Sequence, residues 1–226
     1  MSVHDGHRSR LRSQLLAGGL ESFSDVQVLE LLLTYAIARA DVNPLAHSLL
    51  ERFGSLSGVL DASPEELRQV DGIGEGASAL LSMIPQLLRR YSVDRVSEKQ
   101  VIATTSQLGS YLQPFFIGET EECVYLLCLD AKSAVLDCRK VCTGSVNTVA
   151  VNIRKIVELA IQLRASSVVL AHNHVSGIAM PSREDEETTR ILEQTLDRIG
   201  VALADHIIIA GEDYVSMADS RMLRRI

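Results

Sequence analysis

Hydrophobic and polar positions follow one pattern up to about residue 95 and a different one after it. In the first part the periodic segments have helical spacing. SFSDVQVLELLLTYAI offers Ser24 as an N-cap with Gln27 three residues later, and then apolar residues on one helical face. ASPEELRQV repeats this device with Ser63 as the cap, Pro64 at the first helical position and Glu66 closing a capping box. The first part of the chain is therefore predicted to be helical.

After the polar stretch DRVSEKQ, segments with strand character alternate with helical ones. We predict strands at ECVYLLCLD, SAVLDCRKV, SSVVLAHNH and ALADHIIIAG, and helices at VNIRKIVELAIQLRA and SREDEETTRILEQTLDRIG. Strands that alternate with helices predict an α/β sandwich. With the boundary near residues 96 to 104, the sequence predicts a smaller helical domain over 1–95 and an α/β domain over 104–226.

Length, charge and hydropathy limit the class of protein. A chain of 226 residues that is 46% hydrophobic can bury a real core. The first residues hold no apolar run long enough for a signal peptide, and VLELLLTYAIA is too short to span a bilayer, so the expected location is the cytoplasm. The net charge is −7 and acidic residues exceed basic ones in both halves, which excludes a broad basic surface for nucleic acid. Any DNA contact must be local.

The four cysteines fall on the first two predicted strands, and none of them forms a CxxC pair of the kind that zinc ribbons need. This pattern favours reduced, buried thiols over a zinc site. The residues are Cys123, Cys128, Cys138 and Cys142.

The turn VDGIGEGASA, residues 70 to 79, lies between two predicted helices. Gly72 and Gly74 allow a sharp backbone turn and expose amides at a helix N-terminus, where a phosphate can be held without a basic side chain. The pattern resembles the helix-hairpin-helix module, a family that contacts the DNA backbone in this way. An αα-hairpin turn that uses glycine only for its geometry is an equal alternative.

The stretch AHNHVSGIAMPSRED holds a candidate metal site. Alternate residues of a strand share a face, so His172 and His174 should point the same way. A short loop then leads to a helix whose first turn holds Ser182 and Asp185. Two histidines, one aspartate and a water make the open tetrahedral site of a catalytic zinc. Taken separately, the two halves of the pattern also fit a strand end and a helix capping box.

The order His-x-His, seven residues, Ser-x-x-Asp reproduces the JAMM (MPN+) metalloprotease signature. Together with LLERFGSLSGVLDASPEEL, VDGIGEGASALL, AHNHVSG, PSREDEETTR and ADHIIIAG, it resembles the bacterial RadC family, labelled DNA repair proteins, across nearly the whole chain. The resemblance implies a helix-hairpin-helix region followed by a JAMM-type domain. It also implies Zn²⁺ bound by His172, His174 and Asp185, with Ser182 beside the reacting water or the developing oxyanion.

One position departs from the family pattern. JAMM hydrolases also use a glutamate as proton shuttle, and relatives carry it five residues before the glycine that is Gly144 here, where this chain has Arg139. Arginine cannot act as a base near neutral pH. Three alternatives follow: a shifted alignment with Asp137 as the acid, a replacement by Glu121 or Glu122 from a neighbouring strand, or a metal site that has lost hydrolysis.

Two functional hypotheses follow from these motifs. The first is a zinc-dependent hydrolase that cleaves an amide or isopeptide bond in a peptide or protein. The second is a non-catalytic, DNA-associated adaptor with a structural or vestigial metal, in which Gly72 and Gly74 contact phosphates. His206, at the start of a buried strand, is either a satisfied core histidine or a partner of the zinc ligands. A nucleobase deaminase is excluded, because its signature needs His-x-Glu and a CxxC pair.

Overall fold

The structure is a computed structural model that describes residues 3–38, 40–96, 100–144 and 149–223. The chain divides into two compact units, Met1–Leu88 and Arg89–Ile226, and each unit is described by itself. Within the described residues, none of the helices combines the length and the apolar character that crossing a membrane requires.

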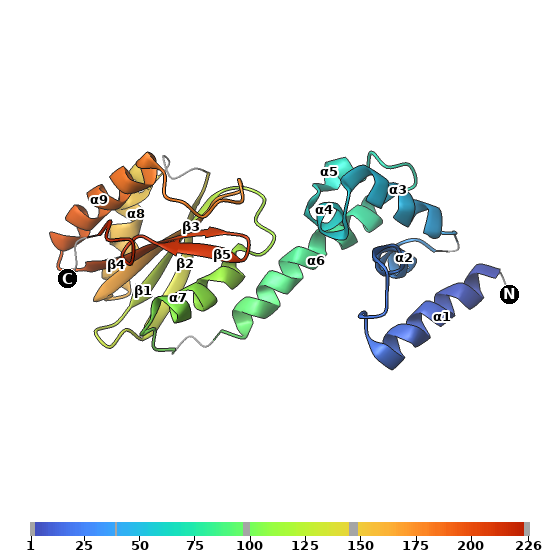
Figure 1. Cartoon of the computed structure of the whole chain (residues 1–226), viewed down its shortest axis with the longest axis horizontal. Coiled ribbons are helices and arrows are strands. Elements are labelled where there is room, and N and C mark those ends of the chain that lie inside the picture. Colours follow the sequence, from blue (N-terminus) through green and yellow to red (C-terminus); the bar gives the residue numbers. More distant parts are fainter. Residues whose placement is uncertain (1–2, 39, 97–99, 145–148, 224–226) are drawn as a thin grey trace. The chain divides into compact units, whose positions relative to one another are not determined.

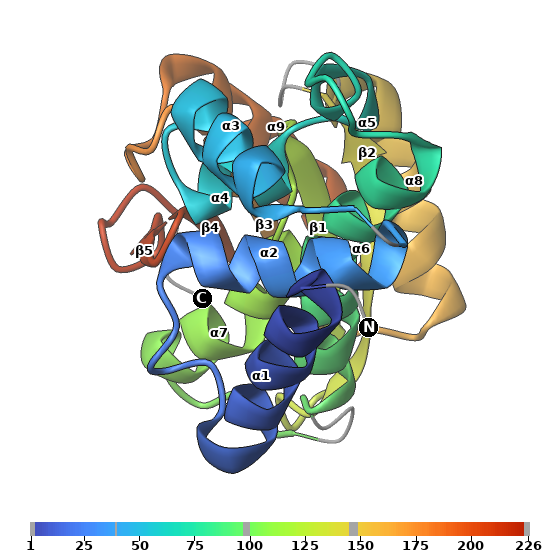
Figure 2. The same cartoon turned by 90° about the vertical axis from the view of Figure 1, so that its right-hand side faces the viewer.

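The first unit is helical and can be followed from α1 to the start of α6 in Figures 1 and 2. Both predicted capping boxes are present, one between Ser24 and Gln27 and the other between Ser63 and Glu66. Leucines such as Leu29 from several of these helices form the buried core of the unit. The helices are α1 Val3–Gly18, α2 Asp25–Ala36, α3 Asn43–Phe53, α4 Leu56–Asp61, α5 Pro64–Leu67 and α6 Glu75–Asp94.

Helix α6 continues from the first unit into the second. Its last turns belong to the second unit, where Val93 packs against the core and Arg89 forms an ion pair with Glu119. Glu119 also binds Lys140, with 2.8 Å between Oε2 and Nζ. The domain boundary expected from the sequence, at residues 96 to 104, follows the end of this helix and stays a prediction.

The second unit is built on a five-stranded sheet with the strand order β2-β1-β3-β4-β5. Strands β3 and β4 are parallel, and the other neighbours are antiparallel. The strands are β1 Cys123–Leu129, β2 Val135–Thr143, β3 Ser167–Asn173, β4 Ala202–Ala210 and β5 Asp213–Ser216. The helices are α7 Thr105–Leu112, the 3₁₀ helix η1 Gln113–Phe116, α8 Val149–Gln162 and α9 Arg183–Asp197.

Helices cover both faces of this sheet. Helices α8 and α9 lie on one face and α7 lies on the other, as Figure 1 shows. Alternation along β3 separates the two cores: Val168 and Leu170 pack with α8 and α9, whereas Val169 and Ala171 pack with α7 and η1. The predicted fold class, a helical region followed by an α/β sandwich, is confirmed.

Two of the cysteines are deeply buried in β1. Burial raises the pKa of the Cys123 thiol to about 12 and that of the Cys128 thiol to about 11. Since the thiolate is the reacting form, we expect iodoacetamide at pH 8 to label the folded protein more slowly than the unfolded one, on the order of a hundredfold at Cys128 and a thousandfold at Cys123. Mass spectrometry of labelled peptides, with a sample in denaturant as the control, measures the ratio. Equal rates in both samples would contradict the burial.

Candidate metal centre

The two histidines of the AHNH segment lie at the end of the central strand β3. His172 is fully buried, and it lies between Val124 of β1 and Ile208 of β4 in the sheet register. His174 follows directly after the strand, and its backbone N–H donates to the carbonyl of Ile209 at 2.8 Å. The hydrogen bonds of a central strand thus fix the backbone of both residues, and strand alternation turns both imidazoles toward one face.

Asp185 reaches the same point from the start of helix α9. Ser182 is the N-cap of this helix, and its Oγ accepts from the backbone N–H of Asp185 at 3.1 Å. In return, Oδ2 of Asp185 accepts from both the backbone N–H and the Oγ–H of Ser182, each at 2.7 Å. This capping box both begins the helix and holds the Asp185 carboxylate, which is almost fully buried, against the end of β3.

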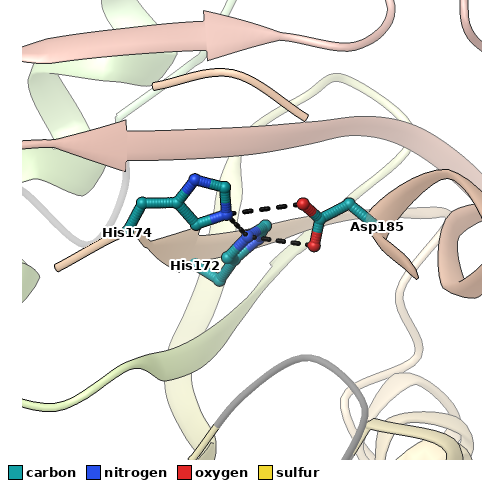
Figure 3. A group of neighbouring side chains, drawn as sticks. All are labelled: His172, His174 and Asp185. Carbon is teal, nitrogen blue, oxygen red and sulfur yellow. Dashed lines mark hydrogen bonds and ion pairs between the residues drawn. The ribbon is translucent and has the colours of Figure 1, made fainter. Parts of the chain in front are cut away.

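The three side chains converge on one point, as Figure 3 shows. Nε2 of His172 lies 2.9 Å from Nε2 of His174 and 3.2 Å from Oδ1 of Asp185, and Nε2 of His174 lies 3.4 Å from Oδ2 of Asp185. Bond lengths of about 2.0–2.2 Å place two ligand atoms of a tetrahedral zinc roughly 3.3 Å apart. The observed spacings match this value, so the donor set fits a single ion.

The Asp185 carboxylate is held in its charged form. Burial alone would raise the pKa of this group, but the hydrogen bonds from His172 and Ser182 outweigh it, so the pKa lies well below its usual range. A charged carboxylate beside two imidazoles has the ligand chemistry of a zinc or similar divalent site.

Behind the three side chains lies a buried hydrogen-bond network. Nδ1 of His172 lies 2.8 Å from Nε2 of His206, and Nδ1 of His206 lies 2.5 Å from Oγ1 of Thr189. His206 is fully buried, and burial is the main cause that lowers its pKa well below the usual value. The sequence left His206 open between a core histidine and a partner of the ligands; it is buried and also contacts His172. The sequence did not single out Thr189. Its position four residues after Asp185 was the available signal, because residues at this spacing lie on the same side of a helix.

The position of the family glutamate is occupied by an ion pair. On strand β2, Nε of Arg139 lies 2.6 Å from Oδ2 of Asp137. Arg139 pairs with Leu126 in the sheet register, whereas the row of His172 runs through Val124. Arg139 and Asp137 therefore lie level with earlier residues of β3 and not with its end, where His172 stands.

Glu122 stands closer to the end of β3. Its carbonyl accepts from the N–H of Gly144 at 2.7 Å, so it extends the pairing of β1 with β2 by one residue. Val124 pairs with His172 in the antiparallel register of β1 and β3, and Glu122 precedes Val124 by two residues in the chain. Alternation then gives the Glu122 side chain the same face of the sheet as Val124 and His172.

The two glycines of the predicted phosphate-binding turn lie between α5 and α6. Gly72 has a positive φ of 91°, and a Cβ there would lie 2.7 Å from a methyl group of Leu45. Gly74 has no other heavy atom within 4 Å of the position that a Cβ would take. Glycine at position 72 is thus required by the fold itself, whereas position 74 faces open space.

Comparison with known families agrees with this fold. The model of the RadC-like JAB domain family matches residues 102–222, which is more than half of the chain. The model of the UPF0758 N-terminal family matches residues 6–79. The chain therefore belongs to the RadC-like JAB domain family, and the resemblance noted from its motifs is confirmed.

The capping box gives a stability prediction for the metal-free protein. Ser182→Ala removes the hydroxyl that accepts from the N–H of Asp185, so we expect a loss of about 1 kcal/mol and a melting temperature lower by about 2–4 °C. Ser182→Thr retains a capping hydroxyl and should melt near the wild type. Thermal unfolding in the presence of a chelator measures both variants. A full loss in the threonine variant would show that the cap is not the cause.

Proposed function

We propose that this protein binds one zinc ion through His172, His174 and Asp185 and hydrolyses an amide or isopeptide bond. The observation that carries the proposal is the convergence of the three donor groups, at spacings of 2.9 to 3.4 Å, on one buried point. When bound, zinc lowers the pKa of water toward neutrality and polarises a carbonyl group.

The burial of the three side chains supports an open site of the catalytic kind. His172 and Asp185 expose 1% and 2% of their side chains, whereas His174 exposes 15%. Solvent thus reaches the group from the side of His174. The ligand set is three protein groups, which leaves the fourth tetrahedral position to water and substrate.

We infer that Glu122 takes the proton from the attacking water and returns it to the leaving amine. The place of Glu122 supports this role, since strand alternation gives its side chain the face of Val124 and His172, next to the end of β3. Its side chain is only partly buried, so a water can reach it. Arg139 cannot take up a proton near neutral pH, because its guanidinium is already protonated. Asp137 is paired with Arg139, so Glu122 is favoured as the proton acceptor.

Ser182 has two roles in this proposal. Its hydroxyl donates to Oδ2 of Asp185 and so orients the carboxylate. To steady an oxyanion as the family resemblance implies, the hydroxyl must turn away from Asp185 toward the substrate. The Ser182 N–H also donates to Oδ2 and would continue to hold the carboxylate.

The loop between His174 and Ser182 supports a peptide or protein as the substrate. Three apolar side chains on it are more than half exposed: Val175, Ile178 and Met180. The carbonyl of Ile178 lies 3.0 Å from Nδ1 of His174, so this loop is tied to the candidate ligand. Exposed apolar groups beside a reactive site are typical of surfaces that bind other chains.

The test is turnover by zinc-replete protein on libraries of peptides and isopeptide-linked conjugates. We expect metal-dependent cleavage that Asp185→Ala abolishes. A protein that carries one zinc per chain and cleaves no member of either library would contradict hydrolysis and leave zinc binding intact.

As a second candidate function, we propose that the turn around Gly72 and Gly74 contacts DNA phosphates. The open space at Gly74 and at Gly76 supports this proposal, because neighbouring side chains leave room for a ligand beside the backbone at the start of α6. Binding of this kind is independent of sequence and weakens with salt.

The DNA proposal is tested with a matched pair of variants. Gly74→Glu adds bulk and negative charge in the turn, and Gly18→Glu makes the same change at the end of α1, where a Cβ also meets no atom within 4 Å. In fluorescence anisotropy with duplex DNA at low salt, we expect Gly74→Glu alone to lose binding. No binding by the wild type, or equal binding by both variants, would contradict the proposal.

A further inference from the structure

The strongest feature outside the three candidate ligands is the buried network of His206, Thr189 and the backbone of Asp185. Oγ1 of Thr189 lies 2.6 Å from the carbonyl oxygen of Asp185 and 2.5 Å from Nδ1 of His206. Nε2 of His206 lies 2.8 Å from Nδ1 of His172. The side chains of His172, Thr189 and His206 are all buried, so their polar atoms need hydrogen-bond partners.

The direction of each hydrogen bond in this network can be worked out from the Asp185 carbonyl, which lies at one end of the network. A backbone carbonyl can only accept, so the 2.6 Å contact between two oxygens requires the Thr189 hydroxyl to donate to the Asp185 carbonyl. The threonine then has no second proton, so it must accept from His206, whose Nδ1 carries the hydrogen. The remaining nitrogen of His206 is free to accept.

The last bond determines the tautomer of His172. A neutral His206 with its proton on Nδ1 has a lone pair on Nε2, which must be met by a proton on Nδ1 of His172. The His172 nitrogen that can offer a lone pair to a ligand is then Nε2, the atom that faces His174 and Asp185. If the Thr189 hydroxyl donated to His206 instead, its Oγ1 and the Asp185 carbonyl oxygen would lie 2.6 Å apart with no proton between them.

We propose that Thr189 and His206 are positioning residues that hold His172 with its proton on Nδ1 and its Nε2 available to a metal. The candidate ligand Asp185 acts twice in this arrangement, through its carboxylate at the site and through its backbone carbonyl at the far end of the network. The network orients the imidazole before any metal arrives, which lowers the reorganisation that binding requires. The proposal deepens the zinc function above and rests on it for its purpose, but the hydrogen-bond order can be measured without metal.

The first experiment is ¹⁵N NMR of metal-free protein with labelled histidine, at one fixed pH. We expect His206 to carry its only ring proton on Nδ1, His172 to carry a proton on Nδ1, and a scalar coupling between Nδ1 of His172 and Nε2 of His206 across their hydrogen bond. A proton on Nε2 of His206, or an unprotonated Nδ1 of His172, would overturn the proposal whether or not the protein binds zinc.

The second experiment measures zinc affinity by chelator competition in Thr189→Val and Thr189→Ser. Valine cannot donate or accept, so we expect a 10- to 100-fold loss of affinity, on the order found for outer partners of metal ligands. Serine retains the hydroxyl and should restore most of it. The control is Thr188→Val, because Thr188 is also buried on α9 and its hydroxyl makes no hydrogen bond to the described residues.

The two experiments separate the failure of this inference from the failure of the proposed function. Wild-type affinity in Thr189→Val would overturn the positioning role. A wild type that binds no zinc would overturn the proposed function, while the NMR result would still decide the hydrogen-bond order. Loss of affinity in Thr188→Val as large as in Thr189→Val would assign the effect to packing and contradict the inference.

Discussion

Asp185→Asn is expected to lose zinc affinity on the order of a hundredfold or more while the metal-free protein stays folded. Zinc sites of four ligands have apparent binding free energies of about 10–16 kcal/mol, so one ligand accounts for roughly 3 kcal/mol, which corresponds to about a hundredfold in affinity. Asparagine retains an amide oxygen that can accept from Ser182, as Oδ2 of Asp185 does. It loses the charge that makes the carboxylate a good ligand.

A companion variant is Ser182→Ala, which removes the hydroxyl that caps α9 and orients Asp185 but keeps the three candidate ligands themselves. Competition with a chromophoric chelator gives the affinity, and thermal unfolding with a stronger chelator gives the stability of the metal-free state. An affinity in Asp185→Asn within a few fold of the wild type would show that Asp185 is not a ligand. A collapse of the metal-free fold in the same variant would instead assign the residue to the helix cap.

Glu122→Gln has the second large expected effect. If Glu122 moves the proton between water and the leaving amine, its amide variant should lose about 10²- to 10⁴-fold in turnover. Zinc content should not change, because Glu122 is outside the group of His172, His174 and Asp185. The measurement is kcat on a cleaved peptide, together with the zinc content of each preparation.

Two further variants sharpen this test. Glu121→Gln changes the neighbouring acid, which lies in a bend one residue further from β1, and it should remain near wild-type turnover. Arg139→Glu restores the glutamate at the position where relatives carry it. If Arg139→Glu raised turnover and Glu122→Gln left it unchanged, the proton would pass through the family position and the role assigned to Glu122 would be wrong.

The fold class and the three candidate ligands could be predicted because they depend on local spacing. Alternation in AHNH places His172 and His174 on one face, and a capping box places Asp185 in the first turn of α9, where its carboxylate turns back to the N-cap. The same local signals identified the caps at Ser24 and Ser63. The two histidines, and each N-cap residue and its partner, are within a few positions of one another in the chain.

The partners of these residues could not be predicted, because they depend on which strands become neighbours. His206 contacts His172 since β4 lies parallel to β3 in the register that pairs Leu170 with His206. Glu122 stands near the end of β3 because β1 pairs with β3, and this pairing joins residues more than 40 positions apart in the chain. Strand order and register are set by the packing of the whole sheet, and a single sequence carries little information about them.

A structural metal site is closed by four protein ligands, whereas a catalytic site leaves one coordination position open to water or substrate. The exposure of His174 and the partly buried Glu122 favour a catalytic site over a structural one. These arguments all assume that the His172, His174 and Asp185 group holds a metal ion.

Elemental analysis tests that assumption most directly. Protein purified without added metal is compared with His174→Ala, a variant that removes the most exposed of the three ligands. We predict about one zinc per chain in the wild type and a large loss in the variant. Wild-type protein with no metal, even after it is offered zinc and desalted, would contradict the metal centre and with it the proposed hydrolysis.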